Sequence, residues 1–460
     1  MKNLFVDCSY LHEHAYLNTG IQRVVRKFVE NAPTLANRYG INVVPVSITY
    51  GDFRPLTLSN LYDNPGTAQT RFKERVYRYA LDVYVTGREL IKAITGRNKR
   101  IEKFLMAPSE EFGLSFLIRK LIQNPFKKKA IQIRDKSFEP FDQVAPGDLL
   151  LLLDSTWYAD IWPSVEKVRE RGGQVISVIY DLIPITHPQF CDDYLAQVFK
   201  NWFMASQGRV DGYVAISRTV RDDLKNFLQD HLEAPPVSER FGYFYLGADF
   251  KPATIDAMTV RQDVMDMFED RPVYLIVSTV EPRKNHAYLL DTFDLLWHRD
   301  KDVSLLIIGR RGWKVEKLIE RISSHPMFGK NLFFREDIGD SELQYCYSRA
   351  RALVFPSIAE GFGLPIIEAL NSGLPVIASD IPVHREIGKN YIGYCDIHDP
   401  ESLAKLITGI EEKGLCDEVP LVQDTHGWIS WEESSRMLFE ACANICALDS
   451  GNLLPVDHRS

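Results

Sequence analysis

The sequence predicts an α/β protein with two doubly wound domains, each built on a largely parallel sheet. Short runs rich in leucine and β-branched residues recur without polar alternation, a pattern typical of strands covered on both faces. Helix-length segments lie between these runs, as in repeated strand–helix–strand units. The runs form two blocks, separated between about residues 251 and 271 by the breakers Lys251-Pro252 and Asp270-Arg271-Pro272. A length of 460 residues also fits two or three domains of roughly 100–200 residues.

The two blocks define the expected domains, at about residues 1–255 and 270–430. The first block has expected strands at Asn3–Val6, Ile41–Ser47, Leu149–Leu153, Gln174–Ile179, Gly212–Ile216 and Tyr243–Leu246. The second has them at Val273–Ser278, Ser304–Ile308, Asn331–Phe334, Ala352–Phe355 and Pro375–Ala378. Expected helices include Gly20–Asn31, Ser341–Arg349 and Pro365–Ser372. Because ligands of open α/β sheets bind beyond the carboxyl ends of the strands, functional residues should directly follow strands.

A basic stretch interrupts the first block at about residues 68–138. From Arg71 to Lys136 it carries 17 Lys and Arg against 7 Asp and Glu, whereas the whole chain has a net charge of −8. Parts of it have helical periodicity, so a helical insertion with a solvated basic face is the simpler interpretation. The alternative is a surface for anionic lipid headgroups, with Lys127–Lys129 beside Phe126 as its best local support.

Composition excludes several classes of protein. With 45% hydrophobic and 25% charged residues, the chain is neither collagen-like nor disordered, and a pI near 5.8 disfavours a nucleic-acid partner. The seven scattered cysteines form no C-x-x-C motif, so we expect reduced thiols without a zinc site or disulfide framework. The start, Met1–Asp7, turns polar too early for a secretory signal, and no run of about 18 apolar residues occurs. We therefore expect a cytoplasmic protein, with peripheral association at the inner face of the membrane as an option.

The strongest chemical signal follows the expected strand Ala352–Phe355. There the chain reads Glu360-Gly361-Phe362-Gly363-Leu364-Pro365, and Glu368 falls one turn into the helix that Pro365 opens. Glycines let the backbone approach a ligand, and the amides of Gly363 and Leu364 form an anion site at the positive end of the helix. Glu360 and Glu368 would then lie at opposite ends of an extended phosphate-containing ligand, where carboxylates accept hydrogen bonds from sugar hydroxyls.

The simpler alternative is a plain turn in which Glu368 only complements the helix dipole. For an isolated pair of glutamates this alternative is favoured. The whole string after a buried strand favours a ligand site instead.

A second signal follows the expected strand Val273–Ser278, where the chain reads Glu281-Pro282-Arg283-Lys284-Asn285. An arginine fork and a lysine point charge are suited to a diphosphate. Alone, this pair of cations would be read as solvated surface. At the same sheet edge as Glu360, diphosphate binding is the better interpretation.

The segment from Phe355 to Ser379 resembles the signature of the family 4 (GT4) retaining glycosyltransferases, which have the GT-B fold of two facing Rossmann-like domains. The resemblance implies that Glu360 contacts the donor sugar, Glu368 the nucleotide ribose, and Lys284 the leaving diphosphate. Many family members carry an arginine where this chain has Ser278, and Arg283 is the candidate to compensate. The region of Trp428 and Ser430–Glu432 is similar to a family helix that crosses back to the first domain, here expected at 431–460.

The resemblance also implies positions beyond these motifs. Tyr180 stands where family members commonly have a histidine near the transferred sugar, and the neighbouring Asp181 keeps its family position. A phenol can hydrogen-bond a hydroxyl but cannot carry a proton near neutral pH as imidazole does. The segment Phe334–Leu343 is similar to the loop and helix start that usually hold the base in this family, which implies that Ile338 presents backbone groups to the base edge. His187 is interpreted as structural, and Ser341 as a helix N-cap. The expected catalytic set is Glu360, Lys284, Arg283 and Asp181, and the expected donor-binding set is Glu368, Gly361, Phe362, Gly363, Leu364, Ile338, Gly309, Gly20 and Tyr180.

No metal or other cofactor is expected. The pattern Asp300-Lys301-Asp302 lies at the wrong edge of the sheet and reads as a turn, and GT-B enzymes as a class neutralise the diphosphate with cations and helix N-termini. The resemblance to bacterial mannosyltransferases implies transfer of a hexose, best mannose from GDP-mannose, to a glycan or lipid-linked glycan in surface-polysaccharide synthesis. The alternatives are a UDP-sugar or other donor, and a non-catalytic nucleotide-sugar-binding scaffold. A Rossmann-type dehydrogenase is excluded, because Asp7 to Gly20 contains no G-x-G-x-x-G.

Overall fold

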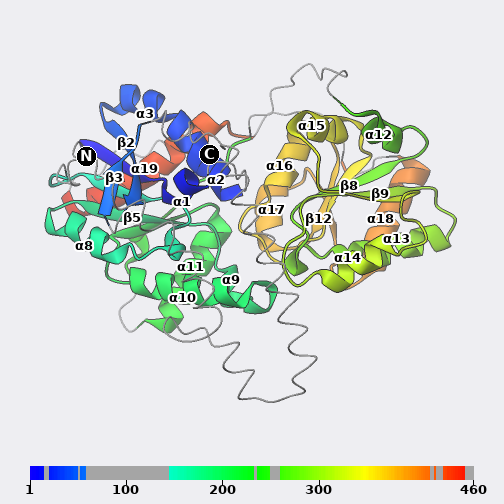
Figure 1. Ribbon diagram of the computed structural model, residues 1–460, viewed down its shortest axis with the longest axis horizontal. Coiled ribbons are helices and arrows are strands. Elements are labelled where there is room, and N and C mark those ends of the chain that lie inside the picture. Colours follow the sequence, from blue (N-terminus) through cyan, green and yellow to red (C-terminus); the bar gives the residue numbers. More distant parts are fainter. Residues whose placement is uncertain are drawn as a thin grey trace, which may run out of the picture. The chain divides into compact units, whose positions relative to one another are not determined.

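The computed structural model describes residues 1–14, 20–49, 52–57, 144–232, 236–248, 260–414, 419–420 and 428–450 (Figure 1). The chain divides into two compact units, one of residues 1–56 with 143–460 and one of residues 57–142. The basic insertion expected at about 68–138, with Lys127–Lys129, lies outside the described residues, as does much of the expected boundary at 251–271.

The first sheet has seven strands in the order β3-β2-β1-β4-β5-β6-β7. All neighbouring strands are parallel except β2 and β3, which form an antiparallel edge pair. The central strands consist largely of buried apolar side chains, as expected for a sheet covered on both faces. The strands are β1 (Asn3–Asp7), β2 (Asn42–Thr49), β3 (Asp52–Pro55), β4 (Leu149–Leu152), β5 (Gln174–Ile179), β6 (Gly212–Ala215) and β7 (Phe241–Tyr243).

Two differences from the expected strands arise at the sheet's edges. The strand expected at Tyr243–Leu246 lies instead at Phe241–Tyr243. The buried chain beyond it, with Phe244 and Leu246, keeps one bond to the sheet, from the amide of Phe244 to the carbonyl of Ala215 (2.9 Å). The strand β3 was not expected, since Asp52–Pro55 buries only Phe53 and contains a proline, which fits an edge strand.

The second sheet has six parallel strands in the order β10-β9-β8-β11-β12-β13. They are β8 (Val273–Val277), β9 (Ser304–Ile308), β10 (Leu332–Arg335), β11 (Ala352–Phe355), β12 (Val376–Ser379) and β13 (Gly393–Cys395). The three-residue edge strand β13 was not expected. Figure 1 shows helices on both faces of this sheet, with α13 and α14 on one side and α15 and α16 on the other.

The helices follow the strand–helix alternation. In the first block they are α1 (Ser9–Glu13), α2 (Gly20–Glu30), α3 (Ala32–Tyr39), α8 (Trp162–Glu170), α9 (Ile183–Thr186), α10 (Asp193–Ser206) and α11 (Arg218–His231). In the second they are α12 (Gln262–Met265), α13 (His286–His298), α14 (Glu316–Ser323), α15 (Asp340–Arg349), α16 (Leu364–Asn371), α17 (Pro382–Gly388) and α18 (Pro400–Lys413). The predicted N-cap Ser341 is wrong, because α15 is capped at Gly339, whose amide donates to the Glu342 carboxylate (3.1 Å).

The last helix, α19 (Trp431–Ser450), packs on the first sheet (Figure 1). Glycines in β6 and β7 permit this close packing: a Cβ built at Gly212 would lie 2.6 Å from Cγ2 of Ile445, and one at Gly242 would lie 3.1 Å from Cβ of Ala441. Tyr39 of α3 donates a hydrogen bond to Glu440 of α19 (2.6 Å). None of the described helices is both long and apolar enough to cross a bilayer.

Candidate functional site

The loop between β11 and α16 is built around two glycines. A Cβ at Gly361 would lie 2.0 Å from the carbonyl oxygen of Tyr180, so the loop can approach the end of β5 only without a side chain at this position. The carbonyl of Gly361 accepts a hydrogen bond from the Ser217 hydroxyl (2.9 Å). Gly363 has φ of 105°, a left-handed conformation that other residues rarely adopt, and it turns the chain into α16. These contacts fix the position of Glu360 between the strand and the helix.

Glu360 is held between two cations. Its carboxylate forms an ion pair with Arg283 (2.7 Å) and another with Lys284, and its side chain is 7% exposed. Burial alone would raise the pKa of Glu360, but the charges of Arg283 and Lys284 outweigh burial and hold the pKa well below its usual range. Glu360 is therefore an ionised, buried carboxylate at the carboxyl edge of the second sheet.

Both cations lie in the short turn Pro282–Lys284, which follows β8. Arg283 also pairs with Glu281 (2.7 Å) and donates to the carbonyl of Ala359 (3.1 Å), so it ties the β8 turn to the Glu360 loop. Lys284 is buried, and its ammonium lies 4.9 Å from the ring centre of Phe355. Burial, followed by the charge of Arg283, lowers the pKa of Lys284.

Asp181 completes the cluster of expected catalytic residues. Its Cβ would lie 3.2 Å from a Cβ at Gly361, and its carboxylate accepts from the amide of Ile183 (3.0 Å). Burial raises the pKa of Asp181, and the positive charge of Arg283 opposes that shift. Burial likewise raises the pKa of Glu281. The structure thus brings Glu360, Lys284, Arg283 and Asp181 together, and it adds Glu281, which the sequence argument had not singled out.

Glu368 is partnered by residues from two other helices. It forms an ion pair with Arg23 of α2 and accepts a hydrogen bond from the Tyr347 hydroxyl of α15 (2.9 Å). Neither partner was identified from the sequence, although Arg23 lies three residues after Gly20, one turn into the helix that opens there. A Cβ at Gly20 would lie 3.9 Å from Cδ1 of Leu364, so the start of α2 adjoins the start of α16.

Four other residues expected to bind the donor lie outside the ion pairs of Glu360 and Glu368. The Tyr180 hydroxyl is buried and donates to the carbonyl of Leu153 (2.8 Å), so it is engaged within the first sheet. Gly309 has φ of 151°, and a Cβ there would lie 1.8 Å from the carbonyl oxygen of Ser278, which makes it a packing position between β8 and β9. Ile338 is half-buried in the turn before α15, and Phe362 is buried, 6.2 Å from the ring of Tyr245.

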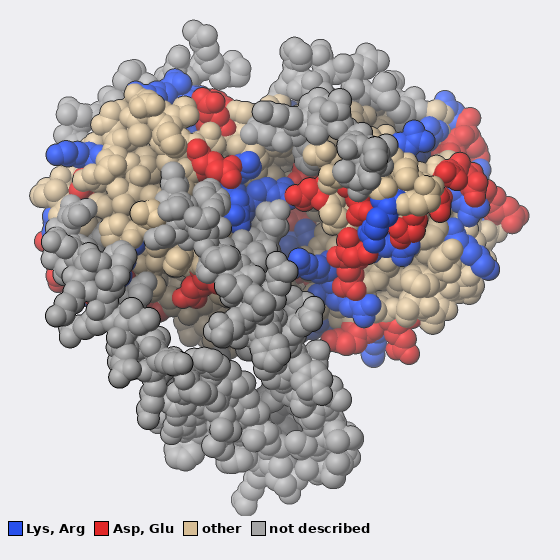
Figure 2. Space-filling view, turned by 45° about the horizontal axis from the view of Figure 1, so that its top comes forward, with Lys and Arg blue, Asp and Glu red and all other residues tan. Residues whose placement is uncertain are grey.

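Charges elsewhere on the described surface are mostly mixed. In Figure 2, acidic and basic side chains lie beside one another over the right-hand part of the view, in agreement with the many exposed ion pairs of the second block. His187 contacts Thr186 (2.9 Å) and stacks on Phe190, as a structural role predicts. Within the part of the chain that is described, no group of three or more His, Cys, Asp or Glu side chains could hold a metal ion.

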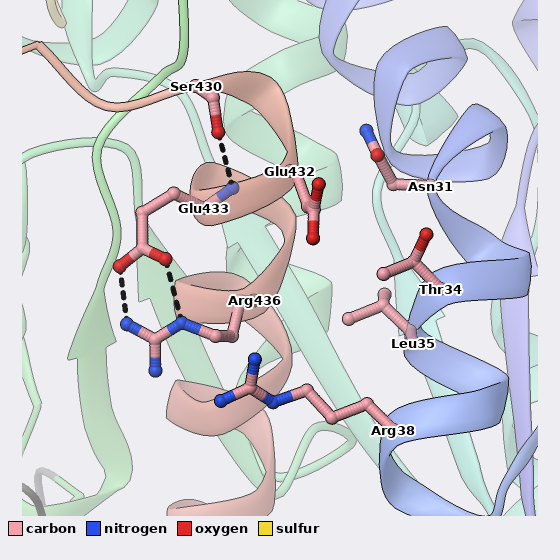
Figure 3. Close-up of a pocket in the computed structure, with 8 residues that line it drawn as sticks. All are labelled: Asn31, Thr34, Leu35, Arg38, Ser430, Glu432, Glu433 and Arg436. Atoms are coloured by element: carbon pink, nitrogen blue, oxygen red, sulfur yellow. Dashed lines mark hydrogen bonds and ion pairs between the residues drawn. The ribbon is translucent and has the colours of Figure 1, made fainter.

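A pocket of about 290 Å³ lies between α3 and α19 (Figure 3). Of its two arginines, Arg436 forms ion pairs with Glu433, which also lines the pocket, and with Glu440. The pocket is lined by Asn31, Thr34, Leu35, Arg38, Ser430, Glu432, Glu433 and Arg436. None of these is an expected site residue, and none follows the carboxyl end of a strand, so we assign the candidate site to the Glu360 cluster.

Comparison with known proteins identifies the family of the domain that holds the second sheet. Residues 262–419, which include the Glu360 cluster apart from Asp181, match the family model described as "Glycosyl transferases group 1". The second sheet is that of a glycosyl transferases group 1 domain. A solved structure titled sucrose-phosphate synthase, from Thermosynechococcus elongatus, is 15% identical with a TM-score of 0.52 and covers 98% of both chains. With the two sheets described above, this likeness confirms the predicted GT-B fold.

Proteins similar to this chain include bacterial mannosyltransferases. The serotype-specific mannosyltransferase WbdA of Escherichia coli is 31% identical over 301 residues, which are 64% of this chain and 37% of WbdA. The O-antigen chain mannosyltransferase RfbU of Salmonella typhimurium is 28% identical over 237 residues, 51% of this chain and 60% of RfbU. The predicted resemblance to this family is confirmed, and the match spans little more than a third of the length of WbdA.

Proposed function

We propose that this chain is a glycosyltransferase that moves a hexose from a nucleotide-diphosphate sugar to a glycan or lipid-linked glycan acceptor during surface-polysaccharide synthesis. The observation that carries the proposal is Glu360, ionised and buried between Arg283 and Lys284 at the start of a helix. Support comes from the group 1 domain and from the two mannosyltransferases similar to the chain. Their names make mannose the leading choice of sugar. GDP-mannose is the donor that we propose, on the sequence resemblance alone.

The proposed binding step is an exchange of partners. A diphosphate entering beside α16 would take Arg283 and Lys284 from Glu360, and Glu360 would then accept hydrogen bonds from hydroxyls of the donor sugar. The cations are already desolvated and held in place, so little reorganisation remains when charge develops on the diphosphate. The amides at Gly363 and Leu364, at the positive end of α16, add to the anion site. Burial raises the pKa of Asp181 and that of Glu281, a direction that favours the neutral carboxyl, the form that does not repel a diphosphate.

The proposed chemical step retains the configuration of the sugar. The bond between the anomeric carbon and the diphosphate oxygen breaks, and its electron pair leaves on that oxygen. The acceptor hydroxyl attacks from the same face and passes its proton to the departing phosphate oxygen. Lys284 and Arg283 stabilise the developing charge, so this mechanism uses neither a metal ion nor a protein nucleophile.

At the nucleoside end, Glu368 would bind the ribose. Arg23 and Tyr347 both donate to this carboxylate and so orient it. Glu368 remains the acceptor for the ribose. A ribose hydroxyl can donate to the remaining lone pairs of this carboxylate. Association with an anionic membrane at the cytoplasmic face, through the basic insertion, remains part of the proposal and rests on the sequence.

The test is a donor screen with a paired assay. We expect release of nucleotide from radiolabelled GDP-mannose to depend on the protein and to rise when a glycan acceptor is added, with UDP-glucose and UDP-N-acetylglucosamine as alternative donors. The configuration of the product, read by NMR, should be that of the donor. Stoichiometric binding of a donor without turnover would support the scaffold alternative, and absence of binding to all of them would overturn the proposal.

A further inference from the structure

The turn that carries Ile338 is held by an arginine from a distant part of the sequence. Arg261, which immediately precedes α12, donates from Nε to Glu342 (2.7 Å) and from Nη1 to the carboxylate of Asp337 (2.5 Å). Its Nη2 reaches both the other Glu342 oxygen and the carbonyl of Asp337, each at 3.2 Å. One planar guanidinium therefore bridges Asp337, which directly precedes Ile338, and Glu342, in the first turn of α15.

Glu342 links Arg261 to Gly339, the last residue of the turn. The residue is buried, and its carboxylate accepts from the amide of Gly339 (3.1 Å) as well as from Arg261. Asp337 is thus fixed directly, Gly339 is fixed through Glu342, and Ile338 lies between them. A lysine could not make these contacts, because an ammonium is a point charge without the rigid fork of arginine.

The location of this turn indicates which part of a donor it would contact. It follows β10 at the carboxyl edge of the second sheet, and the Arg335 carbonyl just before it accepts from the amide of Gly309 at the end of β9 (3.0 Å). Helix α15 starts at Asp340 and reaches Tyr347, the hydroxyl of which bonds Glu368. Seven residues of helix span about 10 Å, so the turn lies roughly that far along α15 from the proposed ribose carboxylate.

We infer that Arg261 is a positioning residue for nucleotide recognition: it holds the turn 337–339 in the one arrangement that presents Ile338 and its backbone to the donor base. This inference rests on the proposed function and deepens it. Arg261 itself is substantially exposed and touches no part of the Glu360 cluster in the described contacts. The pair with Asp337 is exposed, and exposed ion pairs contribute little to global stability. The buried Glu342 keeps the amides of Arg261 and Gly339 as partners when the guanidinium is removed, so the change should affect base recognition more than folding.

The experiment compares binding of GDP, UDP and inorganic pyrophosphate by calorimetry, without any turnover. For R261A we expect binding of the preferred nucleoside diphosphate to weaken at least about tenfold and the GDP-to-UDP preference to shrink. Pyrophosphate binding should be unchanged, because the phosphate-binding residues are untouched. R261K should behave like R261A, since it keeps the charge and loses the fork.

The matched control is R299A. Arg299, which directly follows α13, makes an equally bidentate, exposed pair with Glu401 of α18 (3.0 and 2.7 Å), and its loss should leave all three affinities unchanged. Should R261A fail to fold, D337N removes one arm of the bridge and should show a smaller change in the same direction. Wild-type nucleotide affinity and preference in R261A, or an equal loss of pyrophosphate binding, would overturn the inference alone. A wild-type protein that binds neither nucleotide would overturn the proposed function as well.

Discussion

Burying a carboxylate between two cations has a high cost in desolvation free energy, so such a cluster suggests a functional role. Removing one partner of such a pair leaves an uncompensated charge and typically destabilises a protein by about 3–5 kcal/mol. Glu360, Arg283 and Lys284 meet this description, and Arg283 is further shared with Glu281. The cluster keeps its cations dry and oriented, which is the state in which they would act most strongly on a diphosphate.

Loss of Lys284 should therefore affect turnover far more than donor affinity. For K284A we expect kcat to fall at least about 10²-fold, as for other groups aimed at developing charge. Initial rates at saturating donor test this, with K301A as the control. Lys301 pairs with Glu412 on the surface, so its removal should leave the rate unchanged. A near-wild-type rate in K284A would remove this lysine from the mechanism.

The depressed pKa of Glu360 makes a prediction about pH. A carboxyl with a folded-state pKa below its unfolded value near 4.3 stabilises the protein above that value and loses its contribution as pH falls. The wild-type protein should thus melt higher than E360Q at pH 7, and the gap should narrow as pH falls from about 5 towards 3. Thermal melts of both proteins across this range measure it. A gap that is constant with pH would contradict the ionised pair.

At the scale of single residues, the sequence motifs predicted most of the site residues. They did not predict which of these residues form ion pairs and hydrogen bonds with one another. Glu360, Lys284, Arg283 and Asp181 were expected and lie together. Arg23 and Tyr347 were missed, because contacts such as that between Arg23 and Glu368 join residues 345 positions apart, and no local pattern records them. From the motif, both cations were expected to be available to the diphosphate. In the structure, both form ion pairs with Glu360.

At the scale of secondary structure, burial on both faces made the central strands easy to predict. Runs such as Gln174–Ile179, Ser304–Ile308 and Ala352–Phe355 have the same bounds in the structure, since each is mostly apolar and buried almost throughout. The missed strands, β3 and β13, are short edge elements in which only part of the surface is buried. Partial burial leaves no continuous apolar run, and pairing there depends on the neighbouring strand.

The packing of α19 on β6 depends on a glycine, which gives a prediction at this scale. In G212A, the new methyl group would lie 2.6 Å from Ile445 and 2.8 Å from the Arg240 carbonyl, so we expect a loss of about 1–3 kcal/mol of unfolding free energy. Urea denaturation measures the loss. The matched control is G409A in α18, where nothing lies within 4 Å of the new methyl, and which should be neutral or stabilising. Equal stability of G212A and wild type would contradict the packing described.

At the scale of the whole molecule, the basic insertion contrasts with a chain of net charge −8. If it binds anionic lipid, each lysine near the surface contributes about 1 kcal/mol. Replacing Lys127–Lys129 with glutamine should then weaken co-sedimentation with phosphatidylserine vesicles at least about tenfold, while turnover of a water-soluble acceptor stays intact. Unchanged vesicle binding would leave the simpler interpretation, a solvated helical face.

The proposed partner exchange at Glu360 can be seen in a crystal structure of the protein with GDP-mannose. We predict that the diphosphate contacts Lys284, Arg283 and the first amides of α16, while Glu360 has left both cations and bonds the mannose, and Glu368 bonds the ribose. A nucleotide sugar bound at another part of the molecule, or one beside Glu360 with both ion pairs intact, would contradict the mechanism.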